Sequence, residues 1–351
     1  MKLKKLILTL LILILLLPYQ QTNAESNSPE ITAGAALLMD SKTSKILYSK
    51  NESEKMYPAS TTKIMTAILT LENCNLDDVV TVQYDAIASI PAGYSIAALQ
   101  TGEQLTVNQL LQVMMVHSAN DAANVLAYHI AGSIESFATM MNTKASELGL
   151  EHTHFTNPSG KHDENHYTTA YDLAKIMQYC MKSSTFRTLA GLKFCTIPAT
   201  NKYDERIFTS TNELLTLVDN RNIASNYYYR YAIAGKTGYT TQAKNCLVAV
   251  ANKDDLELIS VILSVGVYPN NISGKFVETK SLFDYGYNNY TIRKLREKDA
   301  IATQIEIGNG TKETKNLDLL ISNDIIATIK QSDLNTEFEP EIQINENLHA
   351  P

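Results

Sequence analysis

Three short motifs in this sequence carry side chains of the types used in serine acyl transfer. Ser60 is followed three residues later by Lys63, Ser118 is followed two residues later by Asn120, and a Lys-Thr-Gly run occupies 236–238. Each motif alone is weak evidence, because each occurs often by chance. Their appearance together, in this order, is typical of enzymes that transfer acyl groups through a serine. We therefore consider the chemistry that each motif predicts and then the elements that must position it.

The first motif predicts an activated serine nucleophile. Proline suits a helix start, so a helix beginning at Pro58 places Lys63 one turn after Ser60 on the same helical face. A serine hydroxyl attacks a carbonyl well only when a neighbouring base takes its proton. A lysine titrates near about 10.4 in water, so a base role requires burial or a nearby cation such as Lys236. We expect Ser60 to be the nucleophile and Lys63 the general base.

The second motif is expected in a loop between two helices, where side chains can point into a cleft. We expect Ser118 to relay the proton to the leaving amine. Asn120 is expected to position Lys63 and the substrate amide. An alternative is that Ser118 or Asn120 caps the helix that begins near Asp121, since both residue types are good N-caps. The flanking motifs favour the catalytic interpretation.

The third motif is expected on an edge strand that faces the cleft. Lys236 and Thr237 are predicted to bind a substrate carboxylate, while the free strand edge pairs with an extended peptide. Gly238 is expected to allow a close approach of that peptide. The backbone N–H groups of Ser60 and Tyr239 are the expected oxyanion hole, because they can aim at the charge that develops on the carbonyl oxygen.

Around these motifs the sequence resembles the serine D-alanyl-D-alanine carboxypeptidases, which are low-molecular-mass penicillin-binding proteins. The resemblance spans about residues 30–291 and includes the blocks 58–67, 117–123, 157–160, 169–174 and 232–240. It implies an α+β protein with a β-lactamase/transpeptidase-like fold, in which a mixed sheet carries a helical subdomain. It also implies a peptidoglycan stem peptide ending in D-Ala-D-Ala as substrate, β-lactams as covalent inhibitors, and neither metal nor organic cofactor. Two positions depart from the usual family pattern, Ala119 in place of Gly and Tyr239 in place of His.

The periodicity of apolar residues supports this architecture. Thr106 and Gln109 form a capping-box pair before a helix that ends near His117, and Gly132 marks the end of the next helix. The order is strands, a helical insert, more strands and a last helix, which predicts a sheet built from both ends of the segment. The expected strands are 35–39, 46–49, 233–240, 245–251 and 256–265, and the expected helices begin at Pro58 or span 107–117, 121–131, 134–148 and 275–287.

The chain is expected to divide into three segments. Residues 1–24 combine a positive start, an apolar stretch at Leu6–Leu17 and small residues before Ala24, as a signal peptide does, so the protein is expected to be exported. The apolar stretch is shorter than the about 20 residues of a membrane-spanning helix, which leaves an uncleaved anchor as the alternative. Residues 25–291 are the expected catalytic domain, and 292–351 a small, apparently incomplete β domain.

The end of the chain and its composition limit the expected partners. Residues 337–351 lack the apolar and basic faces of a membrane-anchoring helix, so no C-terminal anchor helix is expected, and peripheral membrane association is left open. A net charge of -7 argues against nucleic-acid binding. The four cysteines have no metal-binding spacing and are interpreted either as disulfide-bonded or as buried free thiols.

Three alternative functions share some of these motifs. A class A β-lactamase also needs a glutamate that activates water, and no E-x-x-L-N occurs between Asn120 and Lys236. We therefore expect β-lactams to acylate Ser60 and to leave slowly. An endopeptidase that cuts cross-links would use the same nucleophile. A non-catalytic penicillin-binding sensor is disfavoured, because such proteins usually carry transmembrane helices and none is predicted beyond the signal segment.

Overall fold

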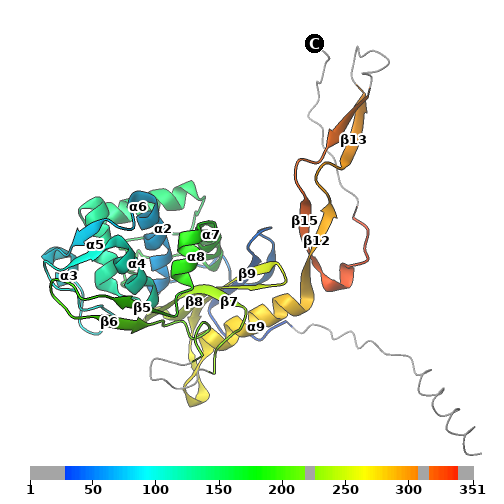
Figure 1. The fold of residues 1–351 in the computed structure, drawn as a ribbon. Coiled ribbons are helices and arrows are strands. Elements are labelled where there is room, and N and C mark those ends of the chain that lie inside the picture. The colour runs from blue at the N-terminus through cyan, green and yellow to red at the C-terminus, as the bar shows by residue number, and fades with distance from the viewer. Residues whose placement is uncertain (1–27, 218–225, 307–315, 339–351) are drawn as a thin grey trace, which may run out of the picture.

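The computed structural model describes residues 28–217, 226–306 and 316–338 (Figure 1). The predicted signal peptide and most of the acidic end of the chain lie outside the described residues. Figure 1 shows a central sheet with helices on both faces, followed by two short β ladders beyond the last long helix. In the described part of the chain no helix is both long and apolar enough to cross a membrane.

The central sheet is built from both ends of the expected catalytic segment. Its strand order is β2-β1-β9-β8-β7, and every neighbouring pair is antiparallel. The expectation of a mixed sheet is therefore wrong in strand direction, because short hairpins join β1 to β2, β7 to β8 and β8 to β9, and β1 also pairs antiparallel with β9. The strands are β1 (Ala35–Asp40), β2 (Ile46–Lys50), β7 (Ala232–Thr240), β8 (Lys244–Lys253) and β9 (Leu256–Val265).

Both faces of this sheet are covered, which explains why its central strands are apolar throughout. In β1, Leu37 and Met39 belong to the core beneath the helical subdomain, whereas Ala36 and Leu38 belong to the core beneath α9 (Gly274–Asn289). Successive side chains of a strand point to opposite faces, so a strand buried on both sides loses the usual alternation with polar residues.

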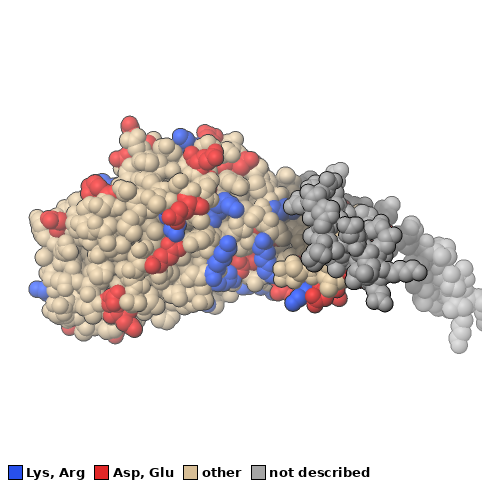
Figure 2. Space-filling model, turned by 90° about the horizontal axis from the view of Figure 1, so that it is seen from above, with Lys and Arg blue, Asp and Glu red and all other residues tan. Residues whose placement is uncertain are grey.

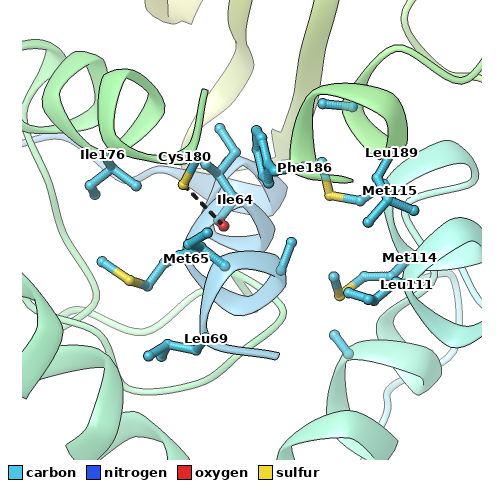
Figure 3. Packing of buried hydrophobic residues seen from close by; sticks show 14 of the residues in the cluster. Ile64, Met65, Leu69, Leu111, Met114, Met115, Ile176, Cys180, Phe186 and Leu189 are labelled. Atoms are coloured by element: carbon cyan, nitrogen blue, oxygen red, sulfur yellow. Dashed lines mark hydrogen bonds between the residues drawn. The ribbon is translucent and has the colours of Figure 1, made fainter. Parts of the chain in front are cut away.

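The helical subdomain surrounds one central helix, α2 (Lys63–Asn73). Figure 3 shows Ile64, Met65 and Leu69 of α2 between side chains of three neighbouring helices, and Cys180 Sγ lies 3.9 Å from the Ile64 carbonyl oxygen. This packing fixes the helix on which Lys63 is the first residue. The other helices are α3 (Tyr84–Ala88), α4 (Val107–Val116), α5 (Asn120–Ala131), α6 (Ile134–Glu147), α7 (Ala170–Cys180) and α8 (Ser184–Ala190).

Local sequence signals placed most of these elements correctly. The capping box between Thr106 and Gln109 is present, and α5 ends at Gly132 in a left-handed conformation. The helix expected from Pro58 begins instead with a 3-10 turn, η1 (Ala59–Thr62), before α2. The periodicity did not predict three small two-stranded ribbons: β3 (Val79–Thr81) with β4 (Gln104–Thr106), β5 (Phe194–Ile197) with β6 (Arg206–Thr209), and β10 (Val267–Tyr268) with β11 (Ile272–Ser273). Two further 3-10 turns are η2 (Pro269–Asn271) and η3 (Gln331–Asp333).

The C-terminal part consists of two ladders that follow α9 directly. Strand β12 (Tyr290–Arg296) pairs with β15 (Ile325–Lys330), and β13 (Ile301–Glu306) pairs with β14 (Asn316–Leu320). Thr328 joins this part to the catalytic sheet, because its hydroxyl bonds to Asp40 and its carbonyl accepts a hydrogen bond from Lys45 at 2.8 Å.

The charged surface agrees with the acidic composition. On the face shown in Figure 2, acidic groups are spread over the helical part, and several basic groups lie close together between them.

Candidate active site

The first two predicted residues meet at the N-terminus of α2. Ser60 lies in the 3-10 turn η1, and Lys63 follows as the first residue of α2. Lys63 Nζ lies 2.9 Å from Ser60 Oγ. Ala59, which precedes the serine, has a φ of 48°, a backbone conformation that non-glycine residues rarely adopt. Strain of this kind persists only where the surrounding structure enforces it, and it concentrates at functional sites.

Lys63 is completely buried, and its amine nitrogen lies within hydrogen-bonding distance of three oxygen atoms. These are Ser60 Oγ at 2.9 Å, Asn120 Oδ1 at 2.8 Å and the Ser159 carbonyl at 2.6 Å. Burial in a poorly solvated site, together with the charge of Lys236, lowers the pKa of Lys63 well below its usual value. The amine is thus both held against the hydroxyl and disfavoured as a cation, which are the two properties that a proton acceptor requires.

Ser118 and Lys236 form a second pair beside the first. Lys236 Nζ donates to Ser118 Oγ at 2.9 Å and to the Thr237 carbonyl at 3.0 Å. Burial, and then the charge of Lys275, lowers the pKa of Lys236 to about 7. Ser118 has a φ of 64°, so a strained backbone presents this side chain as well.

The capping interpretation of the second motif is wrong. The N-cap of α5 is Ala119, and no side chain caps this helix. Asn120 is the first residue of α5 instead of a loop residue, and its amide bridges two segments. Its Oδ1 accepts from Lys63, and its Nδ2 donates to the Ser95 carbonyl at 2.8 Å.

The third motif lies where the sequence placed it, on the edge strand β7. Its glycine is also required by packing within the protein. A Cβ at Gly238 would lie 2.9 Å from the Pro58 carbonyl oxygen and 3.1 Å from Ser60 N, so the missing side chain lets β7 pack directly on η1. Tyr239 follows with 64% of its surface exposed, and Thr237 Oγ1 lies 2.6 Å from Thr211 Oγ1.

A fourth segment, residues 157–160, contributes backbone groups to the site, and the motif analysis assigned no role to them. Ser159 supplies the carbonyl that holds Lys63, and Gly160 packs against the turn that carries Ser60. Asn157 organises this turn, because its Oδ1 accepts from the backbone N–H groups of Ser159 and Gly160, at 3.2 and 2.8 Å. The run Asn-Pro-Ser-Gly was visible as a block in the sequence, but carbonyl groups leave no signature of their own.

These residues border one cavity of about 580 Å³. Lys63 and Lys236 lie beneath its surface, whereas Lys275 at the start of α9 lines it. Sequence reasoning missed Lys275, because no motif surrounds it and it lies 39 residues after Lys236. Apart from Lys63 and Lys236, all predicted site residues line the cavity: Ser60, Ser118, Asn120, Thr237, Gly238 and Tyr239.

Within the described residues, no group of three His, Cys, Asp or Glu side chains is arranged to hold a metal ion, and all four cysteines are free thiols. His166 is buried away from the cavity, where it bonds to the Thr62 hydroxyl at 2.8 Å. The arrangement therefore provides a hydroxyl, two amines of lowered pKa and the edge strand β7.

Comparison with known sequences gives the class of this chain. Residues 21–266 match the family described as D-alanyl-D-alanine carboxypeptidase. The chain is similar to the D-alanyl-D-alanine carboxypeptidase DacF of Bacillus subtilis, with 31% identity over 99% of this chain and 87% of the relative. It is also similar to DacA of Haemophilus influenzae, with 32% identity over 92% of this chain and 78% of that protein.

Solved structures agree with this classification. Penicillin binding protein 5 from Haemophilus influenzae matches with a TM-score of 0.74 and 29% identity, over 88% of this chain and 85% of that one. The D-alanyl-D-alanine carboxypeptidase from Mycobacterium tuberculosis matches with a TM-score of 0.66 and 27% identity, over 74% of this chain and 92% of that one. Fold and site define a penicillin-binding protein of the serine type. The chain belongs to the D-alanyl-D-alanine carboxypeptidase family, which confirms the resemblance and the expected fold.

Proposed function

We propose that this protein removes the terminal D-Ala from peptidoglycan stem pentapeptides through an acyl-enzyme on Ser60. The observation that carries the proposal is the hydrogen bond between the buried amine of Lys63 and Ser60 Oγ, in a cavity that Lys275 also lines. This geometry combines a nucleophile with a base of lowered pKa, as covalent catalysis requires.

Acylation begins when Lys63 takes the proton of Ser60 and the oxygen attacks the carbonyl carbon of the penultimate D-Ala. The tetrahedral intermediate collapses by breaking the C–N bond, and Ser118 relays the proton from Lys63 to the departing amine of D-Ala, so that Lys63 is neutral again. The proximity of Ser118 Oγ to Lys236 Nζ supports a relay at this position. Water then attacks the ester, with Lys63 again accepting a proton, and the shortened peptide leaves.

The oxyanion forms between the backbone N–H groups of Ser60 and Tyr239. Support comes from the tight packing of Gly238 on η1, because it brings the Tyr239 end of β7 next to Ser60 N. Loss of one such N–H donor typically lowers the reaction rate by a factor of about 10² to 10³.

The free carboxylate of the substrate binds among Lys236, Thr237 and Lys275. Two cations and a hydroxyl line or underlie this side of the cavity, which favours an anion there. The substrate backbone then pairs with the edge of β7 as an added strand. A β-lactam enters the same site, acylates Ser60 and is released slowly.

We assign export to residues 1–24 as a signal peptide, catalysis to 25–291 and a small β domain to 292–351. The supporting facts are the charge and apolar pattern of the first residues and the change from α9 to ladder structure at Tyr290. The substrate lies outside the cytoplasm, so the proposed activity requires export.

Release of D-Ala from diacetyl-L-Lys-D-Ala-D-Ala tests this function. Wild type should release one D-Ala per peptide, and Lys63→Ala should lose nearly all activity, whereas the surface control Lys55→Ala should keep it. Normal acylation by Lys63→Ala would remove Lys63 from the base role. Faster cleavage of a cross-linked dimer than of the monomeric peptide would instead favour an endopeptidase.

A further inference from the structure

A buried histidine links the turn that leads to Lys63 with the segment that holds the amine of this lysine. His166 Nε2 lies 2.8 Å from Thr62 Oγ1, and His166 Nδ1 lies 3.0 Å from Thr156 N. Thr62 directly precedes Lys63, whereas Thr156 begins the segment whose Ser159 carbonyl lies 2.6 Å from Lys63 Nζ. One side chain outside the catalytic cavity therefore spans two segments that meet at the base.

The two contacts define the protonation state of the histidine. The backbone N–H of Thr156 can only donate, so Nδ1 of His166 is the unprotonated nitrogen. Nε2 of the neutral ring then carries the hydrogen and donates it to Thr62 Oγ1. Burial favours the same neutral form, because it lowers the pKa of His166 to about 3. At neutral pH the ring thus connects both segments in one defined orientation.

The Ser159 carbonyl matters because it helps to direct the amine of Lys63. Of the three oxygens around Nζ, the Ser159 carbonyl and Asn120 Oδ1 are acceptors only, since Asn120 Nδ2 donates to the Ser95 carbonyl. A neutral amine has two N–H groups and one lone pair. When both hydrogens go to these two acceptors, the lone pair is left for the hydroxyl proton of Ser60. A displaced Ser159 carbonyl would let the lone pair turn away from that proton.

A second threonine shows that this segment is held from one face of the helix. Thr66 Oγ1 donates to the Pro158 carbonyl at 2.6 Å, directly before Ser159. Thr62 and Thr66 lie about one turn apart, so neighbouring positions on one face hold the segment. The contact through His166 ties it to the start of α2, where the base is attached.

We propose that His166 is a positioning residue, which holds the Ser159 carbonyl in place so that the lone pair of Lys63 points at the nucleophile. This inference rests on the proposed function, because that function makes Lys63 the base. His166 lies away from the catalytic cavity and from the groups that bind the ligand carboxylate. Its loss should therefore slow the covalent step and leave the preceding binding step unchanged.

The concentration dependence of penicillin acylation separates these two steps. His166→Asn keeps an acceptor for Thr156 N near the position of Nδ1 but does not reach Thr62, and Thr62→Val removes the same bond from its other end. We expect each variant to lower the first-order rate constant of acylation by about tenfold or more, because misdirected reacting groups can cost about 10² in rate. The dissociation constant of the initial complex should stay as in wild type.

Two further variants serve as controls. Thr62→Ser keeps the hydroxyl that accepts from His166, so it should acylate at the wild-type rate, and the comparison with Thr62→Val does not depend on the folding of any His166 variant. His154→Asn changes a histidine of the same segment that contacts the Asn165 carbonyl instead, and it should also acylate as wild type. Thermal unfolding sets the temperature below which every variant is folded, and the rates are compared there.

A double-mutant cycle distinguishes positioning from a general loss of stability. Thr62→Val and His166→Asn remove the same bond, so the double variant should be no slower than the slower single variant, whereas independent effects multiply. Wild-type rate constants in both single variants, losses that multiply, or weaker initial binding with an unchanged rate constant would overturn the role of His166. Acylation of wild type still supports the proposed function in each of these cases, and only a wild type that penicillin does not acylate overturns that function.

Discussion

Gly160 lies so close to Ala59 that a Cβ at position 160 would come within 1.9 Å of the Ala59 carbonyl oxygen. Gly160 also has a φ of 81°, a conformation that favours glycine. Two segments far apart in the sequence therefore fix the turn that carries Ser60, and a single methyl group at this contact should displace it.

We expect Gly160→Ala to reduce acylation by penicillin at least about a hundredfold, because misplacing reacting groups by about 1 Å can cost that much. The rate of acylation under pseudo-first-order conditions measures this effect. Gly132→Ala is the control, since Gly132 also has a positive φ but no atom lies within 4 Å of its Cβ position. Equal loss of acylation in both variants would attribute the effect to backbone strain instead of the contact with Ala59.

The pH dependence of peptide hydrolysis should report Lys236. Its pKa is lowered to about 7, so the cation is present below that pH and is lost above it. If the cation binds the substrate carboxylate, kcat/KM falls as the pH rises through about 7. Lys275→Gln removes the neighbouring charge that lowers the pKa of Lys236, and should therefore move this alkaline limb to higher pH. A limb that stays in place or moves to lower pH would contradict the assignment.

Asp121 should stabilise the wall of the catalytic cavity. Its carboxylate is buried and accepts hydrogen bonds from the backbone N–H groups of Ala97 and Leu99, at 2.9 and 3.0 Å. Asp121→Ala leaves both donors buried without a partner, which should destabilise folding by about 2 to 4 kcal/mol. Urea unfolding measures the change. Asp77 is exposed, so the control variant Asp77→Ala should have a free energy of unfolding within about 0.5 kcal/mol of wild type. Equal midpoints for Asp121→Ala and Asp77→Ala would refute this role.

The thiols should differ sharply in reactivity. Cys180, Cys195 and Cys246 are buried, and burial raises the pKa of each, to about 11 for Cys246. Cys74 is only half-buried. Ellman's reagent should therefore react slowly with native protein, at Cys74 first, and should titrate four thiols after denaturation without reductant. Fewer than four thiols under those conditions would indicate a disulfide.

The positions of the catalytic side chains could be predicted because local rules fix them. The one-turn spacing from Ser60 to Lys63 holds within a helix start, and the third motif lies on the strand expected at 233–240. These are short-range relationships, and the edge position of β7 followed from the chemistry that its motif requires. The same reasoning located α4 through its capping box.

Other parts of the site depend on contacts between distant segments, which one sequence does not specify. The Ser159 carbonyl reaches Lys63 across 96 residues, and Lys275 reaches the cavity from the helix on the opposite face of the sheet. The antiparallel direction of the whole sheet depends on how β1 pairs with β9, a contact between strands more than 200 residues apart. The contact of Gly238 with η1 became visible only in the folded chain, because the sequence does not show which segment packs on β7.

The central claim is that Ser60 forms a covalent acyl-enzyme. Intact-mass measurement after incubation with a labelled penicillin tests it most directly, with wild type and Ser60→Ala treated side by side. We predict a single adduct on wild type and none on Ser60→Ala. An adduct of equal yield on both proteins would contradict the assignment of Ser60 as the nucleophile.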